Sequence, residues 1–166
     1  MLTNEEAKYL LNLDKVLVDP NQVIDLGLKK NRINLISHED NDCKFWVEIT
    51  SNTKIILKTS IHHLESTNFV GLLRVDFNGR HQNPFGINES VPLYLRQYEG
   101  KFFNTDEPHL HVYIEGYKPL AWAIPLSESN IKITEINEIS DLTNLIVSFA
   151  NEINLSSRLQ IQQAIL

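Results

Sequence analysis

Two histidines and a glutamate occur at even spacing in the segment HLHVYIEG, residues 109–116. In a β-strand the side chains alternate between two faces, so His109, His111, Tyr113 and Glu115 would share one face. Imidazole and carboxylate groups suit zinc, iron, nickel or manganese, and histidines can also transfer protons near neutral pH. The same alternation is typical of the water-facing side of any half-buried antiparallel strand. The segment therefore predicts either a metal or catalytic site, or an ordinary polar face.

A third histidine, His81, begins the turn-forming segment HQNPFG, residues 81–86. Asn83-Pro84 and the glycine that follows favour a rigid turn, which would hold His81 at the end of a strand. We expect His81 to face His109 and His111 across the sheet. An alternative is a solvated loop histidine without a functional role.

Arg74 and Asp76 are two residues apart in the candidate strand FVGLLRVDF, residues 69–77, so they would share a face next to the histidines. An arginine there could neutralise a phosphate or a carboxylate, whereas an exposed Arg–Asp ion pair would contribute little to stability. The adjacent pair His62-His63 points to opposite faces, so at most one of them could join a site.

These residues support two kinds of chemistry. One is a divalent metal held by His109, His111 and Glu115 together with His81. The other is metal-free cleavage of a phosphodiester, such as RNA, by His81, His109 and His111 with Arg74 and Tyr113. In that mechanism a neutral histidine takes the proton of the attacking hydroxyl, and a protonated histidine donates a proton to the leaving group. Arg74 stabilises the developing negative charge.

A non-catalytic alternative is a protein-interaction module that uses the polar face of the sheet and the loop over residues 78–90. The sequence contains none of the phosphate-binding, dinucleotide-binding or serine-hydrolase motifs that would decide the matter. It therefore leaves open whether the protein is an enzyme, and whether its partner is a small molecule, RNA or a protein.

The composition predicts one soluble domain over residues 1–166. The chain has 42% apolar residues and a net charge of −6, which argues against a broad, non-specific grip on nucleic acid but not against a local basic patch. Cys43 is the sole cysteine, which excludes an internal disulfide and suits a reducing compartment. No apolar run is long enough to span a membrane, and no signal peptide is recognisable. We expect a cytoplasmic protein without a membrane partner.

The pattern of apolar residues predicts an α+β fold. Thr3 and Glu6 form a capping box for an N-terminal helix over residues 1–13. Residues 32–126 have the short alternating segments of an antiparallel β-meander, either an open sheet or a half-barrel. The candidate strands are 32–39, 44–50, 54–63, 69–77, 92–98, 109–116 and 119–126. Residues 140–166 predict a helix over 140–155 and a second short helix over 156–166, so the terminal helices would cover the apolar face. Strand 92–98 could pair with a second copy in a homodimer.

The spacing His-x-His-x3-Glu of His109, His111 and Glu115 is similar to the first metal-binding motif of the cupin family, which implies a metal on a strand face. Cupins have a glycine seven residues after the glutamate, where this chain has Trp122. No histidine follows His111, so a further ligand would come from an earlier one such as His81.

A longer resemblance covers most of the chain. The segments RVDFNG (74–79), HQNP (81–84), HLHVYIEGY (109–117), WAIPL (122–126) and TNEEAKYLL (3–11) resemble a small family of uncharacterised bacterial proteins. This resemblance implies no established activity.

Overall fold

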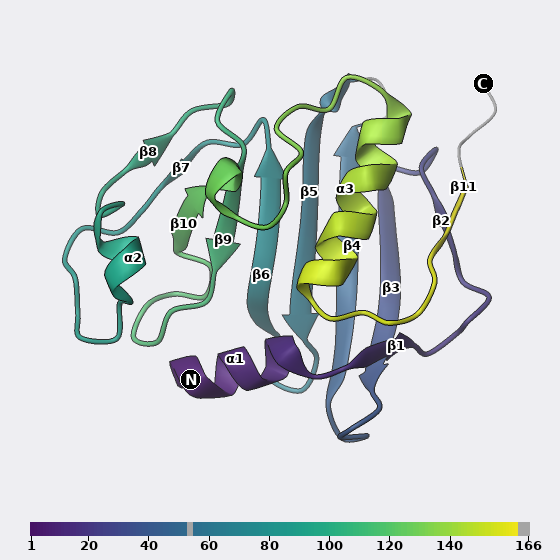
Figure 1. Ribbon diagram of the computed structural model, residues 1–166, viewed down its shortest axis with the longest axis horizontal. Helices are drawn as coiled ribbons and strands as arrows, with labels where there is room; N and C mark the ends of the chain where they lie inside the picture. The colour runs from purple at the N-terminus through teal and green to yellow at the C-terminus, as the bar shows by residue number, and fades with distance from the viewer. Residues whose placement is uncertain (53–54, 163–166) are drawn as a thin grey trace.

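The computed structural model describes residues 1–52 and 55–162, and its centre is one large antiparallel sheet (Figure 1). Seven strands lie in the order β1-β3-β4-β5-β6-β9-β10. They span Lys15–Leu17 (β1), Lys30–Ser37 (β3), Lys44–Asn52 (β4), Ile55–Glu65 (β5), Val70–Phe77 (β6), His109–Val112 (β9) and Trp122–Pro125 (β10). This order does not return β10 to β1, so the described sheet is open. The predicted α+β class with an antiparallel sheet is confirmed.

The predicted meander runs from β3 to β6, where each strand pairs with the next one in the sequence. Alternation of side chains explains why these segments are strands. In β3 the buried Ile33 and Leu35 alternate with the exposed Arg32 and Asn34. One face of the sheet therefore enters the hydrophobic core and the other is polar.

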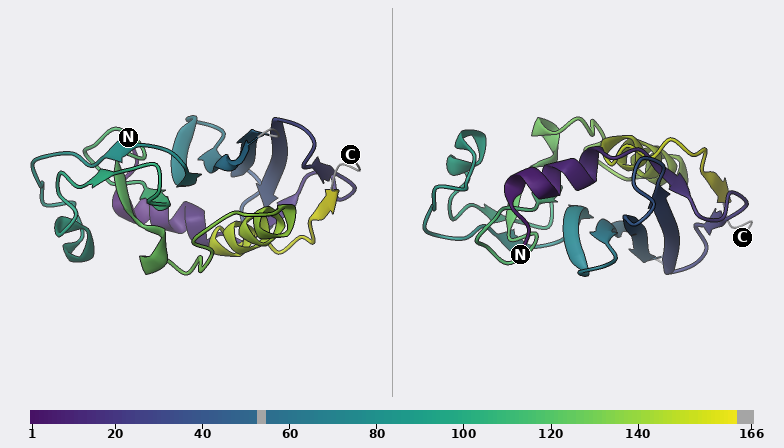
Figure 2. Two further views of the ribbon diagram at one scale, coloured as in Figure 1. Left: turned by 90° about the horizontal axis from the view of Figure 1, so that it is seen from above. Right: turned by 90° about the horizontal axis from the view of Figure 1, so that it is seen from below.

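Helices α1 (Asn4–Asn12) and α3 (Ile139–Glu152) cover the apolar face, and both lie on the same side of the sheet in the two views of Figure 2. The predicted capping box is present, because the Thr3 hydroxyl accepts from the Glu6 amide and the Glu6 carboxylate accepts from the Thr3 amide. α3 buries the stripe Leu142, Leu145, Ile146, Phe149 and Ala150 against the core. Within the described residues, every helix is too short or too polar to cross a membrane.

Residues 78–108 form an excursion between β6 and β9. It contains the paired short strands β7 (His81–Gln82) and β8 (Phe102–Phe103), and the helical turn α2 (Leu93–Arg96). The prediction of a strand over 92–98 was wrong. Leu95 and Tyr98 are the buried residues of that segment, and their spacing of three suits a helical turn rather than a strand. The proposed pairing of this segment with a second copy loses its basis.

The C-terminal segment also differs from the prediction. After α3 and a turn, the chain forms β11 (Gln160–Gln162), which pairs in parallel with β2 (Val23–Asp25). The hydroxyl of Ser157 accepts a hydrogen bond from the amide of Leu17 in β1, so it fastens the segment after α3 to the sheet. The helix predicted over 156–166 is therefore wrong up to residue 162, and its last four residues lie outside the described part of the chain. A short 3-10 helix, η1 (Leu126–Glu128), follows β10.

Candidate metal centre

The register between β6 and β9 brings the predicted polar residues together. Arg74 pairs with His111 and Asp76 pairs with His109, so the four side chains leave the sheet on the same face. This is the face opposite to α1 and α3. The histidines lie where residues 78–108 cover the sheet, and both rings are 0% exposed.

Backbone carbonyls fix the protonation of both buried imidazoles. His109 donates from Nδ1 to the carbonyl of Glu107 at 2.8 Å, and His111 donates from Nδ1 to the carbonyl of Leu120 at 2.9 Å. Because a carbonyl only accepts, each Nδ1 carries the proton, and each neutral ring has a lone pair on Nε2. Metal-binding histidines are commonly oriented by such a bond at the second nitrogen.

Asp76 and Arg74 both contact the second ring nitrogen of His111, Nε2. The Oδ2 atom of Asp76 lies 3.0 Å from His111 Nε2. The Nη2 atom of Arg74 donates to both, at 2.9 Å to His111 Nε2 and 3.0 Å to Asp76 Oδ2. A positively charged group thus occupies the place between a carboxylate oxygen and an imidazole lone pair.

The second imidazole has an unused lone pair. His109 Nε2 is buried and has no hydrogen-bond partner among the described residues, and it lies 3.9 Å from Asp76 Oδ2. The ligand atoms of Asp76, His109 and His111 all lie within 4.8 Å of one another. Donors that bind zinc at 2.0–2.1 Å in a tetrahedron are roughly 3.3 Å apart. The observed spacing is therefore close to that of a coordination sphere.

The surroundings of Asp76, His109 and His111 set the protonation states of the three side chains. Burial lowers the pKa of His109 and of His111, so both rings are neutral at neutral pH. Burial alone would raise the pKa of Asp76, but the positive charge of Arg74, whose Nη2 donates to Oδ2, holds it well below the usual range. The three groups thus have the protonation states that a metal requires.

Asn83 holds His81 beside this cluster. Its amide nitrogen donates to the carbonyls of Tyr98 and Ala123, and its Oδ1 accepts from the Ala123 amide. The same Oδ1 also accepts a second hydrogen bond, from His81 Nε2 at 3.0 Å. With all four hydrogen bonds made, Asn83 fixes the ring of His81, whose centroid is 4.4 Å from that of His111.

His81 itself is not among the clustered ligand atoms. Its Nε2 is shared between Asn83 and the carbonyl of Ala121, 3.0 Å away, and burial lowers its pKa. Phe103 completes the wall, with its ring stacked on His109 at a centroid distance of 4.7 Å. The structure therefore gives His81 a place in the wall of the cluster rather than among its ligands.

Tyr113 and Glu115 lie away from the cluster, contrary to the predicted shared face. β9 ends at Val112, so the alternation that would align them with His109 and His111 does not continue. The Tyr113 hydroxyl donates to the carbonyl of Leu2, and the Glu115 carboxylate accepts from the amide of Asn4 at the start of α1. The predicted metal ligand Glu115 is thus replaced in the cluster by Asp76.

The His62-His63 pair contributes no described ligand. His63 is buried on the core side and stacks on Phe45, whereas the His62 side chain lies outside the described part. Sequence reasoning placed Asp76 only at the flank and overlooked Asn83 and Phe103. Asp76 had an available signal, since it shares the period of two with Arg74, but the two others depend on the path of residues 78–108.

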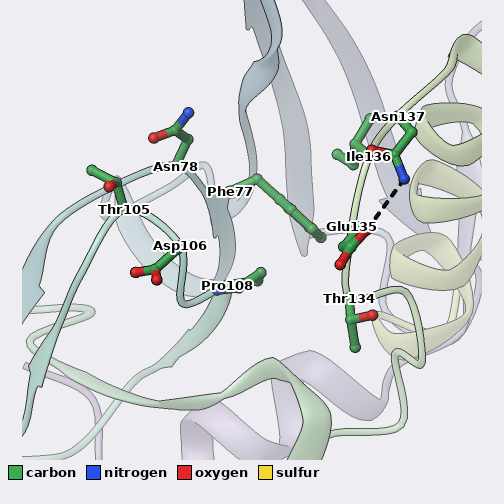
Figure 3. Close-up of a pocket in the computed structure, with 9 residues that line it drawn as sticks. All are labelled: Phe77, Asn78, Thr105, Asp106, Pro108, Thr134, Glu135, Ile136 and Asn137. Carbon is green, nitrogen blue, oxygen red and sulfur yellow. Dashed lines mark hydrogen bonds between the residues drawn. The ribbon is translucent and has the colours of Figure 1, made fainter.

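A cavity of about 370 Å³ lies nearby but belongs to the other side of the sheet (Figure 3). Its wall includes Phe77 and Pro108, the neighbours of Asp76 and His109, together with Glu135 from the segment before α3. Because Phe77 and Asp76 point to opposite faces, this cavity is separate from the cluster.

Comparison with known proteins gives a family of unknown function. No curated protein and no solved structure matches the chain. A profile described as a family of unknown function, DUF6978, matches residues 2–155, which include every residue of the cluster. The chain belongs to this family of unknown function, DUF6978.

Proposed function

We propose that the protein binds one divalent transition metal through Asp76, His109 and His111 and uses it to hydrolyse a phosphodiester. The observation that carries the proposal is the buried, unpartnered Nε2 of His109, which faces the same small space as His111 Nε2 and Asp76 Oδ2. A buried lone pair without a donor is costly, and a metal ion would satisfy it.

The donor set narrows the metal and the reaction. Two imidazoles and one carboxylate suit zinc, iron, manganese or nickel. Three protein ligands leave positions open for water and substrate, as in catalytic zinc sites, and a bound metal lowers the pKa of such a water toward neutrality. Asp76 and Arg74 keep partial exposure, with 16% and 31% of their side chains accessible, so the cluster is open on their side.

The position of Arg74 favours a substrate that carries negative charge. Its guanidinium now bridges Asp76 and His111, but metal binding would compete for the same two atoms. A displaced guanidinium beside the metal is suited to a phosphate oxygen, because its planar donors match that geometry. Metal-free catalysis by two histidines is less well supported, since it requires one protonated ring whereas both imidazoles are buried with Nδ1 already donating to a carbonyl.

Metal binding and hydrolysis can be tested on the same samples. The protein is purified, treated with chelator and titrated with Zn²⁺ and Mn²⁺ by calorimetry, and hydrolysis of bis(p-nitrophenyl) phosphate is followed. We expect one metal per chain and metal-dependent hydrolysis. His109→Ala and His111→Ala should each weaken metal binding by more than about 100-fold.

The control variant is His38→Ala, which removes an exposed histidine from the turn after β3 and should leave metal binding unchanged. Circular dichroism of each metal-free variant verifies folding. Absence of metal binding in the wild type, or equal binding in folded His109→Ala, would overturn the metal site. Metal binding without hydrolysis would overturn the proposed reaction alone.

A further inference from the structure

The polar face of β3 to β6 has no helix over it. In both views of Figure 2, α1 and α3 lie on the other side of these strands. The register aligns the exposed side chains in a row, because Arg32 pairs with Glu48, position 62 pairs with both Glu48 and Arg74, and Arg74 pairs with His111. One continuous surface therefore leads from β3 to the metal cluster. We call it the open face.

Charge is unevenly distributed between this face and the rest of the chain. Its described side chains include the cations Lys30, Arg32, Lys44 and Arg74, and the anions Glu48 and Asp76. The open face thus has an excess of positive charge in a chain whose net charge is −6. Lys30 pairs with Glu48 at 2.9 Å and Arg74 with Asp76, which leaves Arg32 and Lys44 available to an anionic ligand.

Aromatic rings lie beside these cations. The Arg32 guanidinium lies 4.3 Å from the centre of the Trp46 ring, and Phe69 contacts Trp46 edge-on at 5.6 Å. Phe69 is 74% exposed, although a phenylalanine is costly to leave in water. It also has a positive φ of 55°, a strained conformation for a bulky residue. Trp46 is buried between Arg32 and Phe69, so Phe69 is the ring of this group that can stack on a flat ligand.

We infer that the open face binds single-stranded nucleic acid and presents its phosphodiester backbone to the metal cluster. Positive charge beside an aromatic ring that is exposed for stacking is the pattern by which proteins bind single strands, and here Phe69, in the turn before β6, is that ring. Phe69 precedes Asp76 by seven residues along β6, or roughly 23 Å of extended strand, which a few nucleotides span. A duplex is a poorer fit, since its bases are already stacked on one another and unavailable to Phe69. The idea that the bound strand is cleaved rests on the proposed function, whereas the binding of the strand to the open face does not.

The binding test uses metal-free protein, so that it is independent of the metal site. Fluorescence anisotropy measures binding of a fluorescein-labelled uridine dodecamer to chelator-treated protein at low and moderate salt. We expect saturable binding that weakens as salt rises, because phosphate contacts release counterions. Arg32→Ala and Phe69→Asn should each weaken binding by about 5- to 100-fold. Asparagine at position 69 tolerates the positive φ, so this variant removes the ring without adding strain.

Matched controls lie on the opposite side of the molecule. Lys8→Ala and Tyr9→Ala remove an exposed cation and a half-exposed aromatic ring from α1, and should leave binding unchanged. A duplex of the same length and poly-glutamate serve as competitors. The inference would be overturned if the dodecamer did not bind, or if the α1 variants lost as much affinity as the variants of the open face. It would also be overturned if poly-glutamate bound in preference to the dodecamer, which would indicate an acidic protein partner.

The two proposals fail in different ways. If the dodecamer binds but no metal does, the inference that the open face binds single strands is supported and the proposed hydrolysis is wrong. If metal binds and bis(p-nitrophenyl) phosphate is hydrolysed but the dodecamer does not bind, the reaction stands and this substrate class falls.

Discussion

His111 and Asp76 face each other with two hydrogen-bond acceptors, the imidazole Nε2 and the carboxylate Oδ2, at a distance of 3.0 Å. The proton of the imidazole is on Nδ1, where it binds the carbonyl of Leu120. Two acceptors so close together repel unless a donor or a cation lies between them. Arg74 supplies that group through Nη2, and a metal ion is the alternative occupant.

Replacement of Arg74 should therefore strengthen metal binding. Arg74→Gln removes a positive charge that competes for His111 and Asp76, and we expect the affinity for Zn²⁺ to rise roughly tenfold. Hydrolysis of bis(p-nitrophenyl) phosphate should nevertheless fall by about 100-fold, because the anion loses its charged donor. Competition with a chromophoric chelator measures the affinity.

The control for this variant is Arg158→Gln, which removes an exposed arginine from the C-terminal segment. It should change neither quantity. A weaker affinity in Arg74→Gln would show that Arg74 supports the ligands instead of competing with a metal.

Asn83 should contribute strongly to stability although it is outside the ligand group. It is 1% exposed, and its side chain makes four hydrogen bonds, to Tyr98, Ala123 and His81. Asn83→Ala leaves buried partners unsatisfied, so we expect the free energy of unfolding to fall by roughly 3 kcal/mol. Urea denaturation measures it, with the exposed Asn41→Ala as control. A loss below about 1 kcal/mol would mean that water replaces these bonds.

The strands that flank the cluster could be predicted, whereas their register could not. Alternation of apolar residues identifies β3 to β6 because one face enters the core. The pairing of Asp76 with His109 depends on how β6 meets β9 across residues 78–108. A one-residue shift would move Asp76 to the opposite face from His109. The even spacing of His109 and His111 thus indicated a shared face, but not that Asp76 would be the third member of the cluster.

The failed predictions have local causes. Glu115 was predicted from alternation that stops at the end of β9, after Val112. The strand over 92–98 was predicted from composition, although Leu95 and Tyr98 have helical spacing. In both cases tertiary contacts, absent from a single sequence, decided the local structure.

Lys15 should act as a buried link between two helices. Its side chain is 0% exposed, and Nζ donates to the carbonyls of Leu11, Leu13 and Ile153, each at 2.9 Å. These carbonyls lie at or near the C-terminal ends of α1 and α3, where backbone acceptors need partners. Lys15→Met keeps the volume but leaves the carbonyls unsatisfied, so we expect the free energy of unfolding to fall by roughly 3 kcal/mol.

Chemical denaturation measures this effect, and Lys8→Met provides a control on the exposed side of α1. Unchanged stability in Lys15→Met would mean that the cost of burying the ammonium group equals the gain from its three bonds.

The metal-free protein should lose stability as the pH falls from 7.5 to 5.5. Burial lowers the pKa of His81, His109 and His111 in the folded state, while the unfolded chain has histidines of ordinary pKa, near 6.5. Below that pH the unfolded state binds more protons, so acidification favours unfolding. The lowered pKa of Asp76 acts only below about pH 4, outside this window.

Thermal unfolding of chelator-treated protein measures the trend, and we expect a Tm lower by several degrees at pH 5.5 than at pH 7.5. His109→Gln removes one of the three groups, so its Tm should depend less on pH. With saturating Zn²⁺ the dependence should steepen, because protons compete with the metal for Asp76, His109 and His111. An equal or higher Tm of the metal-free wild type at pH 5.5 would mean that the cluster accepts a proton in the folded state, which favours acid–base chemistry by the histidines over a metal centre.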